Sequence, residues 1–171
     1  MSIFHRYSST IHGNYRKAYL RCGLATGLML TAYVVLRLLL GSPLGSPASY
    51  VSDAILLVAL FLFAAAYRKA LPDKKITLKE AMLFGIGLSL VAALFYGLAL
   101  WAIGLASPQQ TVLFTTTMAQ PITPEDPQLH YWAAWWAIVA GVEMLLLGCF
   151  GAFIAAIFLR NEKSEIKHKQ K

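Results

Sequence analysis

Four long apolar stretches dominate this sequence, and each is long enough to cross a lipid bilayer as a helix. They run over residues 22–40, 50–67, 81–105 and 132–159. A helix rises 1.5 Å per residue, so about 20 residues cross the roughly 30 Å of hydrocarbon. The second stretch is the shortest and needs its polar-flanked ends to complete the crossing. The sequence therefore predicts an all-α, polytopic membrane protein with four transmembrane helices.

The composition favours a membrane protein over a soluble globule. Of the 171 residues, 58% are hydrophobic and only 13% are charged, whereas about a quarter are charged in a typical soluble domain. A soluble chain of this length cannot hide so much apolar surface. The two cysteines, Cys22 and Cys149, form neither a disulfide framework nor a zinc-binding spacing. We expect them to be small apolar fillers, and we expect no metal and no cofactor.

Turn and capping signals separate the four stretches. Residues 41–49 contain two Gly and two Pro and predict a tight turn. Thr77 and Glu80 have the spacing of a capping box at the start of the third helix. Residues 123–126 place a proline and two acids where the fourth helix could begin. Residues 111–119, TVLFTTTMA, predict either a short strand or an interfacial segment.

Lysine and arginine alternate strictly between the segments that flank the spans. All but one of the 15 lie in an arm, residues 1–21, in the loop after the second span, or in a tail, residues 160–171. The loops at 41–49 and 106–130 contain none. The positive-inside rule then predicts that both termini are cytoplasmic, on either side of a transmembrane domain, residues 22–159. We expect the basic segments to contact anionic lipid headgroups rather than nucleic acid.

Aromatic residues mark the opposite interface. Tyr131, Trp132, Trp135 and Trp136 cluster where the fourth span would leave the bilayer, and Trp101 lies near the corresponding end of the third span. Indole rings favour this half-wet layer. The alternative is that these rings line a ligand pocket.

Small residues recur at every fourth position of the third span, and shorter series occur in the first and fourth. Lipid tails give helices little hydrophobic reason to associate, so close backbone approach between small residues supplies the attraction. We predict helix packing, not a binding site; the alternative is the general frequency of Gly and Ala in membrane helices. The predicted packing residues are Gly23, Gly27, Ala81, Gly85, Ser89, Ala93, Gly97, Gly141, Gly148 and Ala152.

Three ionisable residues fall inside the predicted spans: Arg37, Asp53 and Glu143. Such residues are costly in lipid and are functional candidates. Glu143 lies about 12 Å beyond Trp135 along the helix. Arg37 could reach down to Glu143 or up to the headgroups and Asp53. The functional interpretation is a proton or ion relay; the simpler one is an interhelical hydrogen bond that fixes helix pairing.

Glu143 also lies about 200° around the helix from Gly141. The fourth helix would then need two covered faces, either from a central position in the bundle or from self-association in a homo-oligomer. A larger membrane complex is the other expected partner.

The run KKITLKEAMLFGIGLSLVAALFYGLALWAI, residues 74–103, resembles an uncharacterised bacterial family, domain-of-unknown-function family 4199. The order of segments is similar over most of the chain: basic arm, Gly-containing first span, YRK after the second span, capped third span, outer loop, fourth span and basic tail. The resemblance implies a bacterial inner-membrane location. It supplies no activity and no functional residues.

No catalytic motif is present in the sequence. There is no HExxH, no GxSxG, no Gly-rich phosphate loop and no intramembrane aspartate pair. We therefore predict that the chain is not an enzyme but a structural or accessory membrane protein that acts through helix contacts. The alternative is an oligomeric transporter or ion-translocating subunit that uses Glu143 and Arg37; without an internal repeat, four spans are few for a transporter acting alone.

Overall fold

The computed structural model describes residues 15–41, 49–71, 76–117, 123 and 127–159, and its regular structure there is entirely helical. Four helices are long and apolar enough to cross a membrane, and a short one, α5, follows the third. In chain order they are α2 (Tyr15–Leu39), α3 (Ser49–Ala70), α4 (Leu78–Ala106), α5 (Pro108–Thr117) and α6 (Leu129–Leu159). The predicted all-α fold with four membrane-spanning helices is confirmed.

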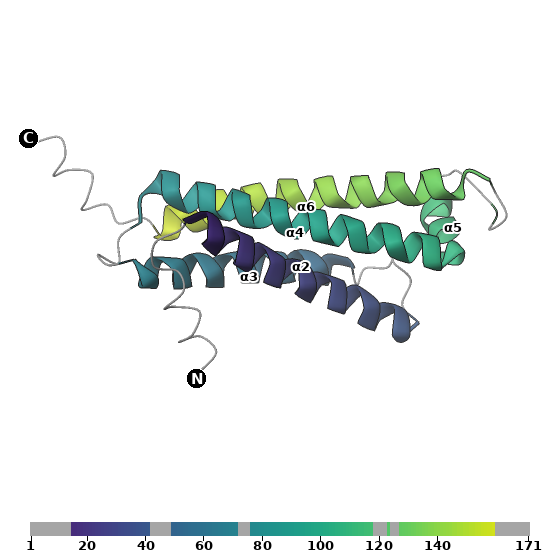
Figure 1. Cartoon of the computed structure of the whole chain (residues 1–171), viewed down its shortest axis with the longest axis horizontal. Helices are drawn as coiled ribbons and strands as arrows, with labels where there is room; N and C mark the ends of the chain where they lie inside the picture. Colours follow the sequence, from purple (N-terminus) through teal and green to yellow (C-terminus); the bar gives the residue numbers. More distant parts are fainter. Residues whose placement is uncertain (1–14, 42–48, 72–75, 118–122, 124–126, 160–171) are drawn as a thin grey trace, which may run out of the picture.

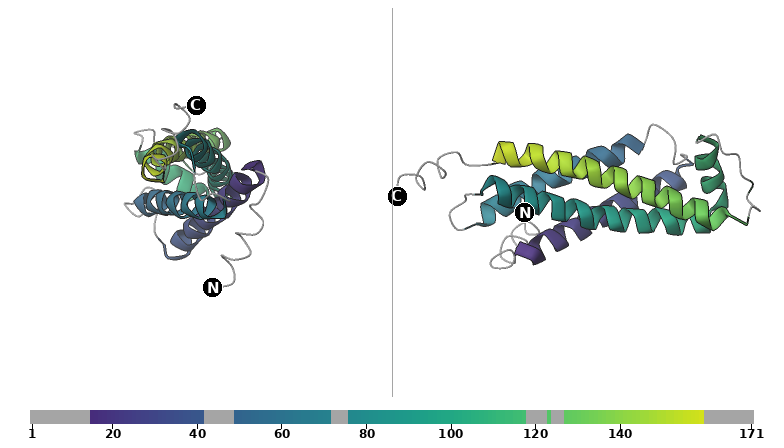
Figure 2. Two further views of the ribbon diagram at one scale, coloured as in Figure 1. Left: turned by 90° about the vertical axis from the view of Figure 1, so that its left-hand side faces the viewer. Right: turned by 90° about the horizontal axis from the view of Figure 1, so that it is seen from above.

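The four long helices form an elongated bundle in which successive spans run in opposite directions (Figure 1). The start of α2 and of α4 and the end of α3 and of α6 lie at one end of the bundle, and α5 lies at the other (Figure 1). α4 and α6 lie side by side along most of their length, while α2 and α3 cross them obliquely (Figure 2). Below, the end that carries α5 is called the α5 end.

Small residues bring α4 and α6 into close contact. A methyl group added at Gly85 would lie 2.5 Å from the Cβ of Ala152. One added at Gly148 would overlap the Ser89 side chain. Nearer the α5 end, a methyl group at Gly97 would lie 3.3 Å from the carbonyl oxygen of Ala137. The small-residue series of α4 therefore meets small residues of α6 within the same chain, where dispersion contacts between backbones hold the pair together.

α2 packs on another side of α4, and glycines of α2 again allow the two helices to lie close together. A Cβ atom at Gly23 would lie 2.7 Å from the Cβ of Val91, and one at Gly27 would lie 2.6 Å from the Cβ of Phe95. α4 thus contacts both α2 and α6, and its buried residues, such as Phe84 and Leu88, form the centre of the bundle.

α3 begins well inside the bundle rather than level with its neighbours. The Leu56 side chain reaches to 3.6 Å of a Cβ built at Gly148, which lies far along α6. Ser49, seven residues earlier, is then about level with residue 141 of α6, roughly 18 Å from the first residue of that helix. Asp53, in the second turn of α3, therefore lies close to the level of Glu143.

The cap predicted for the third helix is confirmed. Thr77 is the N-cap of α4, and its hydroxyl accepts a hydrogen bond of 3.2 Å from the Glu80 backbone N–H. The Glu80 carboxylate accepts a hydrogen bond of 3.0 Å from the Thr77 backbone N–H in return. Both amides would otherwise lack partners at the start of the helix.

The predicted segment at residues 111–119 forms no strand where the structure describes it. Pro108–Thr117 is a helix, and the Thr111 hydroxyl donates a hydrogen bond of 3.2 Å to the carbonyl oxygen of Gly104. Pro108 takes the first helical position, where its fixed φ favours a helix, and the Gln110 backbone N–H donates a 2.9 Å hydrogen bond to the Ser107 carbonyl oxygen. These local signals outweigh the β-branched residues that suggested a strand.

Several boundaries also differ from those expected. α2 begins at Tyr15, inside the segment predicted as a basic arm, whereas α4 begins at Leu78, directly after the predicted Thr77 cap. α6 begins at Leu129, after a turn at Pro127 and Gln128. Residues 124–126, predicted as the first turn of that helix, lie outside the described residues, as do residues 1–14, 42–48 and 160–171.

Candidate functional site

The three ionisable residues of the predicted spans come together from three helices. Arg37 lies in the last turn of α2, Asp53 in the second turn of α3 and Glu143 near the middle of α6. All three are within electrostatic range of the Tyr96 hydroxyl of α4, and Asp53 and Glu143 are within range of each other. Together with Ser52, these residues are called the polar cluster below.

Arg37 points into the protein. Its side chain is 4% exposed, and its guanidinium carbon lies 5.8 Å from the centre of the Tyr33 ring, a cation–π distance. An arginine that snorkelled to the headgroups would instead expose its guanidinium group. Arg37 is thus the buried cation of the polar cluster.

Sequence reasoning missed two members of the polar cluster, Ser52 and Tyr96. The two hydroxyls lie beside each other, but Ser52 Oγ completes no well-formed hydrogen bond with the described residues although Ser52 is fully buried. A hydroxyl next to Asp53 in an apolar helix was the available signal for Ser52. Tyr96 gave none, because a tyrosine in a span predicts interfacial placement as readily as burial.

Glu143 is the exposed member of the polar cluster. Its side chain is exposed although it is near the middle of a 31-residue apolar helix. It has no hydrogen bond or ion pair to the residues that the structure describes. Asp53, by contrast, is partly buried, and Tyr96 is 6% exposed. The carboxylate of Glu143 therefore faces outward from the bundle at a depth where lipid is the default solvent, which is energetically costly for a charged group.

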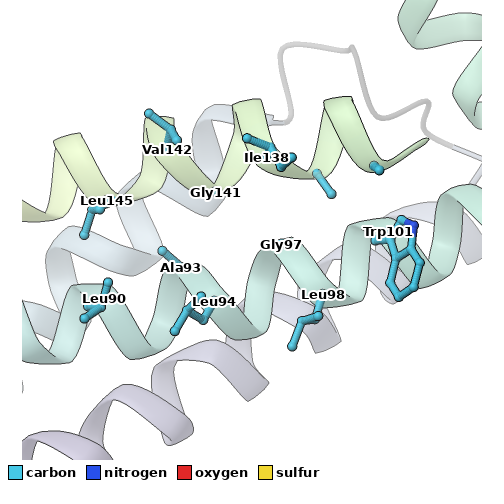
Figure 3. Close-up of a pocket in the computed structure, with 12 residues that line it drawn as sticks. Leu90, Ala93, Leu94, Gly97, Leu98, Trp101, Ile138, Gly141, Val142 and Leu145 are labelled. Carbon is cyan, nitrogen blue, oxygen red and sulfur yellow. The ribbon is translucent and has the colours of Figure 1, made fainter. Parts of the chain in front are cut away.

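An open apolar groove lies between α4 and α6, with a volume of about 380 Å³ (Figure 3). Its small lining residues include Ala93, Gly97 and Gly141, three of the predicted packing residues. Large side chains flank it; Leu94 and Leu98 come from α4 and Ile138 from α6 (Figure 3). Eleven of the twelve lining residues have no polar side-chain atom, and the twelfth is Trp101, whose indole N–H is a hydrogen-bond donor (Figure 3). The groove therefore offers mainly shape and dispersion contacts.

The aromatic residues divide into two groups. Trp101, Tyr131 and Trp135 are exposed near the α5 end, at 43%, 64% and 47%, as an interfacial belt requires. Trp136 is only 5% exposed and belongs to the hydrophobic core with Leu100 and Ala137, so its expected place in that belt is wrong. Of these residues, Trp101 lines the groove between α4 and α6 (Figure 3), and Tyr131, Trp135 and Trp136 do not.

Basic residues with described side chains gather at the other end of the bundle. Lys17 and Arg21 lie near the start of α2, Arg68 and Lys69 at the end of α3, and Lys79 at the start of α4. Among the described residues, the α5 end has no Lys or Arg except Arg37, which is buried. The bundle thus has one cationic end and one aromatic end.

Among the described residues, no group of three His, Cys, Asp or Glu could hold a metal ion. Comparison of the chain with family models, with curated proteins and with solved structures gave no match. The resemblance to domain-of-unknown-function family 4199 therefore stays a prediction, and function has to be argued from the geometry.

Proposed function

We propose that this chain is a small, non-enzymatic protein of the bacterial inner membrane that acts as a structural or accessory subunit through helix contacts with itself or with a larger complex. One observation carries this proposal: Glu143 is exposed near the middle of a membrane-spanning helix. A carboxylate at that depth requires a partner, a proton or water. A helix from another chain satisfies it and covers apolar surface as well.

The proposed topology has both termini in the cytoplasm, with contact between the basic segments and anionic headgroups. Support comes from the basic residues at the start of α2 and α4 and at the end of α3, opposite the exposed aromatic residues at the α5 end. The positive-inside rule assigns the first end to the cytoplasm. The exposed aromatic residues agree with an interface at the α5 end, because indole rings favour the interfacial layer. Membership of family 4199 would agree with this location.

Crosslinking in native membranes tests the accessory role. We would replace Cys22 and Cys149 by Ala and introduce one cysteine at Leu146, which is 66% exposed on α6, or at Leu28, which is 53% exposed on α2. A bifunctional maleimide should give a product of higher mass from the Leu146 position, and Leu28 serves as the matched lipid-facing control. Recovery of monomer alone from both positions would contradict the proposal.

A second candidate is an oligomeric ion-translocating subunit, and the juxtaposition of Asp53, Tyr96 and Glu143 favours it. Two carboxylates and a phenol from three helices could pass a proton or hold a cation. Flux of protons or sodium ions into proteoliposomes containing the purified chain tests this candidate. Equal flux in the wild type and in Glu143→Ala would exclude it.

A further inference from the structure

We infer that the Glu143 side of α6 is a docking surface for a transmembrane helix of a different protein, and that this partner helix carries a lysine or arginine near mid-membrane. The inference rests on the proposed accessory function and names the chemistry of the partner. Its first basis is charge: Glu143 places a carboxylate on the exposed side of α6, and no described Lys or Arg side chain forms an ion pair with it. A cation on a partner helix would neutralise it.

The location of each group shows why the chain itself does not supply that charge to Glu143. Arg37 is 4% exposed and its guanidinium carbon lies over the Tyr33 ring, 5.8 Å from the ring centre, so the side chain belongs to the interior of its own bundle. The other described Lys and Arg side chains lie at the end of the bundle away from α5, near the membrane surface. Within the polar cluster, Glu143 is the exposed carboxylate, whereas Asp53 is partly buried.

Glu143 lies too deep in the membrane for the lipid headgroups to supply the positive charge that would pair with its carboxylate. Glu143 lies about 12 Å along α6 from Trp135 and about 24 Å from Leu159. A glutamate side chain is too short to cover either distance. A cationic side chain on a helix that lies alongside α6 reaches this level without crossing the bilayer interface, and pairing in the membrane interior is the usual solution for such residues.

A second copy of this chain does not meet the requirement. It would bring another Glu143 to the contact, and like charges repel strongly where water is absent. Its Arg37 is buried, so it has no described mid-membrane cation to offer. Charge complementarity therefore points to a different chain.

The surface of α6 beside Glu143 is a row of exposed apolar side chains against which a second helix could pack. Large apolar residues follow Glu143 at alternating spacings of three and four along α6, and all are exposed: Leu146 at 66%, Phe150 at 62%, Phe153 at 46% and Ile157 at 45%. Such a seam allows side chains of a second helix to interdigitate at a small crossing angle. We call Glu143 and these four residues the Glu143 face.

Single-span peptides of defined sequence test the inference without knowledge of the natural partner. The full chain, labelled with a donor fluorophore, is reconstituted in phosphatidylcholine vesicles with acceptor-labelled Leu/Ala peptides whose central residue is Lys, Leu or Glu. Energy transfer measures association. We expect the Lys peptide to bind roughly tenfold more tightly than the Leu peptide, the scale of a polar contact between membrane helices.

Three variants assign that preference to Glu143. Glu143→Gln should reduce the difference between Lys and Leu peptides to less than about twofold, and Glu143→Lys should transfer the preference to the Glu peptide. Leu94→Gln is the matched control, because Leu94 is 59% exposed on the opposite groove side of the bundle; it should keep the Lys preference. Circular dichroism of each reconstituted variant establishes that it is folded.

Several outcomes would overturn the inference. They are equal binding of Lys and Leu peptides, a Lys preference that survives Glu143→Gln, or self-association of the chain that depends on Glu143. If crosslinks form at Leu146 but peptide binding ignores charge, the accessory function stands and the basic partner is wrong. If neither is found, both proposals fail.

Discussion

At the scale of single residues, the bundle depends on positions where almost no side chain is present. Gly148 and Ser89 lie at a close approach of α6 to α4, and the Ser89 hydroxyl donates a 2.8 Å hydrogen bond to the Gly85 carbonyl of its own helix. That internal bond satisfies a buried polar group without requiring a partner from α6. The contact between the helices is therefore steric, and its tolerance to substitution can be predicted residue by residue.

We expect Gly148→Ala to lower the thermal unfolding midpoint in detergent. The added methyl group would overlap the Ser89 side chain, and overpacking of this kind typically costs about 1–3 kcal/mol. Gly141→Ala is the matched control on the same helix, because its methyl group would lie 3.6 Å from the Ala93 carbonyl oxygen, an ordinary contact. Equal midpoints for both variants would contradict the close α4–α6 contact.

At the scale of elements, local chemistry decided where helices begin. The Thr77 capping box was readable from spacing alone, and its two hydrogen bonds are present in the structure. The helix at Pro108–Thr117 had a local signal in Pro108, which favours the first helical turn, but the β-branched residues that follow suggested a strand. Propensity failed there because the hydrogen bond from Thr111 to Gly104 holds the segment against the end of α4.

Thr77→Ala should destabilise the start of α4 by about 1 kcal/mol, since it leaves the Glu80 amide without its acceptor. Hydrogen exchange of amides in the first turn of α4 measures the effect, and faster exchange is the expected result. Thr31→Ala is the control, because the Thr31 hydroxyl bonds to the Gly27 carbonyl within a continuous helix and caps nothing. Unchanged exchange in Thr77→Ala would show that the cap is dispensable.

At the scale of the whole molecule, the sequence predicted the number of spans because apolar length is a local property. It could not predict which helix faces which. The small residues Gly85 and Ser89 of α4 could have packed against any helix, and in the structure they pack against α6 of the same chain. The polar cluster was equally inaccessible, because Asp53 reaches the level of Glu143 only through the deep start of α3, which depends on the packing of Leu56 near Gly148.

Cysteine labelling tests the central claim most directly, namely that the chain crosses the membrane four times with its cationic segments on one side. In a chain that lacks Cys22 and Cys149, single cysteines would replace Arg21, Leu40, Lys79 or Gln109, or follow Lys171. An impermeant maleimide added to intact spheroplasts should label the positions at Leu40 and Gln109, and label the others only after lysis. Labelling of Arg21, Lys79 and the added terminal cysteine from outside, or of all five positions alike, would contradict this account.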